Sequence, residues 1–212
     1  MPNVVKPRLR GVFHQWAFFV SLLAGTVLVL VAPAGRATLA TAIYSVTVAS
    51  LFGVSAIYHR VNWVSEKARR WMRRLDHSMI FCLIAGTYTP FALLVLDGSL
   101  ATAILIGVWA GALAGIVLNL IWVDAPKWVT ATVYITLGWV AIFALPDMAS
   151  KLGATAIALI GIGGVLYTAG AVIYALRRPN PAPAVFGYHE IFHVLVIAAA
   201  AIQYAVIAVY VV

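Results

Sequence analysis

Charged side chains are scarce in this chain. Only 9% of its 212 residues are Asp, Glu, Lys or Arg, whereas 64% are hydrophobic and the mean hydropathy is +1.03. In soluble domains about half of the residues are apolar and roughly a quarter are charged. The composition therefore excludes an ordinary water-soluble domain and indicates a protein that folds in lipid.

Cysteine is almost absent, because Cys82 is the only one. A single cysteine inside an apolar run can form neither a disulfide framework nor a thiolate zinc site, so we interpret Cys82 as a packing residue. The net charge of +8 would suit nucleic acid, but the basic residues cluster in short connections between apolar stretches. That distribution is typical of membrane topology, and we expect no nucleic-acid partner.

Long apolar runs fill most of the chain. Because a helix satisfies its own backbone hydrogen bonds, a run of about twenty apolar residues is most stable in lipid as a transmembrane helix. Short connections containing Pro, Gly and Asp separate the runs. The sequence predicts an all-α membrane protein, a single seven-helix transmembrane domain over residues 1–212 with spans at 13–31, 38–58, 77–96, 100–123, 128–145, 152–176 and 188–211.

Lysine and arginine are distributed unevenly between the two sides of these spans. Twelve lie on the side of the amino terminus, and only Arg36 and Lys151 lie on the other. Because basic loops are retained in the cytoplasm, we predict a multi-pass protein of the inner (plasma) membrane with a cytoplasmic amino terminus and an outside carboxyl terminus. This orientation is opposite to that of G-protein-coupled receptors and microbial rhodopsins, and no predicted span contains a lysine that could bind retinal.

Ionisable side chains at membrane depth are costly, so their positions are informative. Four of the six acids fall in connections between spans, while Asp76 and Glu190 lie at the cytoplasmic mouths of helices, each beside a histidine. The span count places all five histidines at this same depth, namely His14, His59, His77, His189 and His193.

His189 and His193 are four residues apart, so both imidazoles lie on one face of a helix and can bind one metal ion. An imidazole from His59 would complete the three-ligand arrangement of catalytic zinc, with a fourth position for water. Asp76 would accept a proton from that water, and Ser55, one turn before His59, would donate to a developing oxyanion. We therefore predict a Zn²⁺ site with three histidine ligands and two catalytic groups.

Simpler roles compete with this hypothesis. A lone histidine at a membrane interface more often snorkels or forms a hydrogen bond than binds a metal, which is our interpretation of His14 and His77. Ser55 taken alone would be an ordinary small residue at a helix contact. Glu190 is interpreted as an interfacial acid near the basic loops, with a supporting role at the metal site as the alternative.

Three segments resemble the hemolysin III family, the bacterial branch of the progestin and adipoQ receptor superfamily that includes the adiponectin receptors. They are Ser55-Ala-Ile-Tyr-His59, the stretch from Leu75 to Phe91 that begins Leu-Asp-His-Ser, and His189-Glu-Ile-Phe-His193. The resemblance implies zinc held by His59, His189 and His193, with Asp76 contacting zinc-bound water and Ser55 nearby. The family often has an acid and an asparagine before its first histidine, whereas Pro7 and Arg10 stand there in this chain, so the resemblance assigns no role to His14.

The segment from His189 to His193 also reads His-Glu-x-x-His, the metalloprotease signature in which the glutamate is the general base. Site-2-type intramembrane proteases combine it with a downstream Leu-Asp-Gly, and this chain contains Leu96-Asp97-Gly98. However, the order of the two motifs is reversed, and Asp97 is expected on the opposite side of the membrane, about 30 Å away. The protease hypothesis is therefore disfavoured.

The favoured function is a zinc-dependent hydrolase acting on a lipid amide or ester, because zinc lowers the pKa of bound water to about 7 and the site would open at lipid level. The wider superfamily similarly includes ceramidases. The alternative is a non-enzymatic membrane sensor or regulator in which zinc ties the second, third and seventh helices together. A cytolytic pore, suggested by the family name, lacks the polar stripe expected in its spans. The sequence leaves the substrate and the oligomeric state open.

Overall fold

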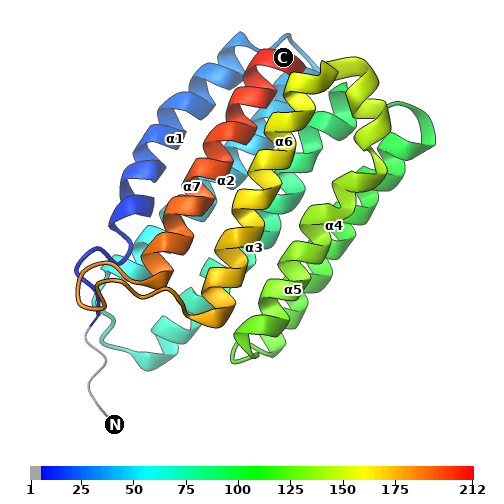
Figure 1. Cartoon of the computed structure of the whole chain (residues 1–212). Helices are drawn as coiled ribbons and strands as arrows, with labels where there is room; N and C mark the ends of the chain where they lie inside the picture. Colours follow the sequence, from blue (N-terminus) through cyan, green and yellow to red (C-terminus); the bar gives the residue numbers. More distant parts are fainter. Residues whose placement is uncertain (1–5) are drawn as a thin grey trace.

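Helices account for nearly all of the computed structural model, which describes residues 6–212. They run side by side as one bundle (Figure 1). A short 3₁₀ helix, Trp139–Phe143, continues the fifth helix, and a π-helical turn, Ile207–Val211, ends the seventh. The described residues form seven α-helices, which are α1 (Val12–Val31), α2 (Arg36–Arg60), α3 (Glu66–Leu94), α4 (Gly98–Ile121), α5 (Lys127–Gly138), α6 (Leu145–Leu176) and α7 (Tyr188–Val206).

Between residues 6 and 212, six helical segments are long and apolar enough to cross a membrane, and the exception is the shorter apolar segment Lys127–Phe143. Because the 3₁₀ helix rises more steeply than an α-helix, α5 and its continuation still extend about 28 Å, close to the thickness of the hydrocarbon core. The prediction of an all-helical membrane bundle is confirmed. The number of crossings and their orientation stay predictions.

Two helix boundaries differ from the expected spans. Helix α3 begins at Glu66 rather than at 77, because the basic connection after α2 forms its first turns and Ser65 caps it by accepting from the Ala68 N–H. Helix α6 begins at Leu145 but leaves the helical conformation at Gly153, so the expected span from residue 152 matches the part after this break.

The most buried helices are not the most hydrophobic ones. In α2 and α3, 61% and 56% of the most apolar stretch is buried inside the protein, against 22% in α1 and in α6. The outer helices therefore expose large apolar side chains, for example Leu23, Leu30 and Ile162, which are suited to lipid contact. The chain is a multi-pass membrane protein whose core lies around α2 and α3.

One end of the bundle carries the amino-terminal segment 6–11 and the connections 61–65, 122–126 and 177–187 (lower end in Figure 1). We call it the histidine end, because α2 finishes and α7 starts there. At the opposite end Lys151 Nζ donates to Asp97 Oδ2 over 2.6 Å. This hydrogen bond and the lysine charge hold the pKa of Asp97 below its usual value.

Close packing of α3 against α4 depends on a glycine. The ring of Phe81, which is 1% exposed, occupies the space where a Cβ on Gly115 would lie. Interior side chains are close-packed, so any side chain at this position must push the ring or the helix aside.

We therefore expect Gly115→Ala to destabilise the protein by about 1–3 kcal/mol through overpacking. Thermal unfolding in detergent, followed by loss of monodisperse protein, measures the effect. Gly107→Ala is the matched control on the same helix, because no atom lies within 4 Å of its added Cβ. Equal melting temperatures for the two variants would contradict the packing argument.

Candidate metal centre

Three buried imidazoles meet at the histidine end. His59 lies in the last turn of α2, and His189 and His193 lie in the first turns of α7. The Nε2 atoms of His59 and His189 are 3.0 Å apart, and one ligand atom from each of the three rings lies within 4.8 Å of the others. All three residues are buried. The structure thus brings together the three histidines that the sequence indicated as metal ligands.

The geometry of these rings fits a divalent metal ion. Tetrahedral nitrogen ligands 2.0–2.1 Å from zinc lie about 3.3 Å from one another, so the His59–His189 pair needs to widen only slightly. His193 Nδ1 is buried without a hydrogen-bond partner among residues 6–212. Buried polar atoms normally have a partner, and a bound ion is one way to supply what is missing at this ring. Three imidazoles are a donor set that Zn²⁺ and other first-row divalent ions all accept.

A buried carboxyl group stands beside the imidazoles. Asp76, the first buried residue of α3, is 8% exposed, and its Oδ2 lies 4.0 Å from His59 Nε2. The hydroxyl of Ser55 neighbours this carboxyl group. Both residues that the sequence indicated as catalytic groups therefore lie at the same end of the bundle as the histidine cluster, and Asp76 adjoins it.

His14 was expected to snorkel or to form a hydrogen bond at the membrane interface, and it does neither. It is only 3% exposed, and both of its ring nitrogens are without a hydrogen-bond partner in the described part of the chain. Its ring stacks on His193, with centroids 3.8 Å apart and planes 8° from parallel. His14 therefore positions the ring of a candidate metal ligand, a role that the sequence did not indicate.

Glu190, which the sequence placed near the basic loops, does pair with a basic residue of the amino-terminal segment. Its side chain is 0% exposed, a burial that the sequence did not indicate. One carboxylate oxygen accepts from Arg10 Nε, and the other accepts from the Gly187 N–H over 2.8 Å. A buried carboxylate needs a partner of opposite charge. Had Glu190 been recognised as buried, this rule would have pointed to Arg10, the last basic residue before α1.

The backbone before α1 folds over His59. Gly11 has a φ of 80°, and a Cβ on it would lie 2.6 Å from the Cβ of His59. Only glycine combines this left-handed conformation with such a close approach. Backbone hydrogen bonds from Arg8 N to Ala184 O and from Leu9 N to Val185 O join the same segment to the connection before α7. The segment 6–11 thus closes the histidine end of the bundle.

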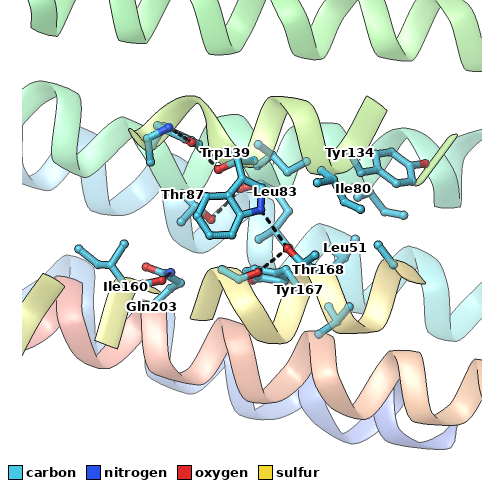
Figure 2. Close-up of a pocket in the computed structure, with 18 of the residues that line it drawn as sticks. Leu51, Ile80, Leu83, Thr87, Tyr134, Trp139, Ile160, Tyr167, Thr168 and Gln203 are labelled. Atoms are coloured by element: carbon cyan, nitrogen blue, oxygen red, sulfur yellow. Dashed lines mark hydrogen bonds between the residues drawn. The ribbon is translucent and has the colours of Figure 1, made fainter. Parts of the chain in front are cut away.

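A mainly apolar cavity of about 190 Å³ extends from the histidine cluster between α3, α5, α6 and α7. His189, His193, Asp76 and Ser55 border it at one end, and Gln203 borders it toward the other. Figure 2 shows its middle, where Trp139 Nε1 donates across the cavity to Thr168 Oγ1 over 3.0 Å. The cluster therefore borders a mainly apolar space within the bundle.

The metalloprotease alternative does not fit this geometry. Asp97 pairs with Lys151 at the far end of α3, about 30 Å along the helix from Asp76. Glu190, which would be the general base in the signature, is held by Arg10 and the Gly187 N–H. Neither acid of the two protease motifs is placed to serve the histidine cluster.

Fold and site together define a polytopic helical membrane protein with a buried histidine cluster at one end. The family described as Haemolysin-III related matches residues 3–204, and the chain belongs to this family.

Among similar proteins, the Hemolysin-3 homolog of Bacillus subtilis (strain 168) is 32% identical over 162 residues, which cover 76% of this chain and 72% of the relative. Hemolysin-3 of Bacillus cereus is 29% identical over 215 residues, covering 100% of this chain and 94% of that protein. The human Monocyte to macrophage differentiation factor is 27% identical over 165 residues, covering 76% and 66%. These relatives support the resemblance to the progestin and adipoQ receptor superfamily as well as to its bacterial branch.

If the cluster binds a metal, His59→Ala should remove it, because two imidazoles alone hold a divalent ion much more weakly. We expect about one metal ion per chain in the native protein purified without chelator and far less than that in the variant, measured by inductively coupled plasma mass spectrometry. His77→Ala is the control, since His77 is not part of the cluster. Equal metal content in the two variants would argue against the site.

Arg10→Ala should destabilise the protein by about 3–5 kcal/mol, because it leaves the buried Glu190 without its counter-charge. The exposed neighbour Arg8, whose backbone alone contacts the connection before α7, supplies the control Arg8→Ala. Thermal unfolding in detergent compares the two. A double change Arg10→Leu/Glu190→Leu should recover much of the loss, whereas no recovery would mean that the ion pair is not the cause.

Proposed function

We propose that this protein is a zinc-dependent hydrolase of lipid amides or esters in the bacterial cytoplasmic membrane. The observation that carries the proposal is the meeting of three buried imidazoles, a carboxyl group and a hydroxyl group at the end of an apolar cavity. Three protein ligands leave a fourth position of a tetrahedral ion open, which is the arrangement of catalytic rather than structural zinc sites.

The chemistry divides between the metal and the residues of the chain. When bound, zinc acts as a Lewis acid and lowers the pKa of a coordinated water to about 7. The Asp76 carboxylate, whose Oδ2 lies 4.0 Å from His59 Nε2, would accept the proton of the attacking water and return it to the leaving amine or alcohol. The Ser55 hydroxyl would donate a hydrogen bond to the oxyanion of the tetrahedral intermediate.

The cavity indicates what the substrate would be. Its walls are mainly apolar and it lies between apolar helices of the bundle, so an acyl chain can lie there and place its carbonyl group at the histidine end.

For orientation, we propose that the chain crosses the membrane seven times and that the histidine end faces the cytoplasm. The support is charge: twelve of the fourteen lysines and arginines belong to this end. Exposed tryptophans at the same end, Trp16, Trp71 and Trp128, are suited to the interfacial layer of the membrane. Hydrolysis would then take place near the inner leaflet.

The competing function is a sensor or regulator in which zinc is structural. What favours it is that the cluster joins α2 to α7, two helices that are far apart in the sequence. In that case metal removal would lower the melting temperature, but no lipid would be turned over.

Turnover of a panel of long-chain amides and esters, including N-acyl sphingoid bases, tests the hydrolase. We expect His193→Ala and Asp76→Asn to reduce kcat/KM by at least roughly 100-fold, since one removes a metal ligand and the other the proton acceptor. Asp124→Asn is the control for the acid, because Asp124 is exposed and pairs with Arg70 and Arg73. Native rates in His193→Ala would remove the catalytic claim.

A further inference from the structure

A second cavity lies at the histidine end, on the other side of the histidine cluster. It is an open vestibule of about 770 Å³. Segment 6–11, the end of α2, the start of α3 and the connection before α7 form its walls. We call it the basic vestibule, and its lining includes Lys6, Arg10, His59, Asn62, Arg69 and Asn180.

Cations gather in this vestibule. Lys6, Arg10 and Arg69 line it, and Arg60 stands close to Lys6. Partial burial, followed by the nearby Arg60, Arg10 and Arg69, lowers the pKa of the Lys6 ammonium group. A lysine whose charge is disfavoured by its neighbours indicates positive charge that the surrounding residues do not neutralise.

In the described part of the chain, two acids pair with these cations, and neither pair neutralises the positive charge of the vestibule completely. Glu190 accepts from Nε of Arg10, and no bond from the terminal amino groups of that guanidinium is found among residues 6–212, so four N–H donors are left for a ligand. Glu66 lies 3.7 Å from Arg69, but both side chains are more than half exposed, and such a pair is weak. The vestibule therefore keeps an excess of positive charge.

The histidine cluster separates the basic vestibule from the apolar cavity. His59 lines the vestibule, whereas His189 and His193 line the apolar cavity. Only 3.0 Å separates the Nε2 atoms of His59 and His189. A molecule with an apolar part in one space and an anionic part in the other would therefore place the junction of its two parts at the candidate metal centre.

We propose that the basic vestibule binds the anionic headgroup, a phosphate or a carboxylate, of a single-chain acyl lipid whose chain lies in the apolar cavity. This inference rests on the proposed function and specifies its substrate class, because the acyl bond of such a lipid lies between the headgroup and the chain. Arg10 and Arg69 supply planar, forked donors that match phosphate or carboxylate oxygens, and Lys6 adds a point charge.

The test measures binding without turnover, in the native protein in uncharged detergent. The probe is an ether-linked single-chain glycerol phosphate, which has no acyl bond to hydrolyse. Its affinity is compared with that of the phosphocholine analogue of equal chain length and with that of inorganic phosphate. Two double variants carry the same loss of charge: Lys6→Gln/Arg69→Gln within the vestibule, and Arg8→Gln/Lys67→Gln, exposed at the same end but outside its lining.

We expect the native protein to bind the phosphate lipid at least roughly tenfold more tightly than the phosphocholine lipid. The vestibule variant Lys6→Gln/Arg69→Gln should have a roughly 10- to 30-fold lower affinity for the phosphate lipid. The control variant should change it less than threefold. Equal losses in both variants, or equal affinity for the two lipids, would overturn the proposal. Inorganic phosphate that binds as tightly as the phosphate lipid would also overturn it, by showing a free-anion site. Because the probe cannot be hydrolysed, these outcomes do not depend on whether the protein is an enzyme.

Discussion

The approach of His59 to the His189 and His193 pair is the contact on which the other functional features depend. It requires the last turn of α2 and the first turns of α7 to meet, although 129 residues lie between His59 and His189. The short segment before α1 stabilises this meeting, because Gly11 packs directly on His59 and the adjacent Arg10 pairs with Glu190 of α7. Segment 6–11 thus contacts both the end of α2 and the start of α7, the two helix ends that carry the imidazoles.

Several polar groups are buried at the histidine end, and their burial is costly unless they form hydrogen bonds or ion pairs with one another. The carboxylate of Glu190 is satisfied by Arg10 and by a backbone N–H, and Asp76 adjoins His59 and Ser55. At the histidine end, both ring nitrogens of His14 and Nδ1 of His193 have no hydrogen-bond partner among residues 6–212, and a metal ion would satisfy part of this deficit by taking a ring nitrogen of His193. Among residues 6–212, the other buried polar side chains, such as Thr41, Thr89 and Gln203, carry no charge, so the buried acids and histidines are confined to one end of the bundle.

The sequence predicted the features that follow from composition and from local spacing. Apolar runs predicted the helices, because backbone groups in lipid must be satisfied within the segment, and the i,i+4 spacing of His189 and His193 predicted their shared face. The span count placed His59 at the same membrane depth as this pair, and the resemblance independently implied it as the third ligand. The roles of Arg10, Gly11 and His14 were missed because each arises from a contact between segments remote in the chain, such as the ring stacking of His14 on His193. A positive φ at Gly11 has no signature in the sequence beyond the glycine itself.

X-ray absorption spectroscopy at the zinc edge of the purified native protein tests the central claim most directly, because it reports which atoms surround the metal. The account predicts one zinc ion per chain with three imidazole nitrogens at 2.0–2.1 Å and one further light atom from solvent or ligand. A native, folded protein that holds no metal, or a metal whose shell contains fewer than three imidazoles, would contradict it.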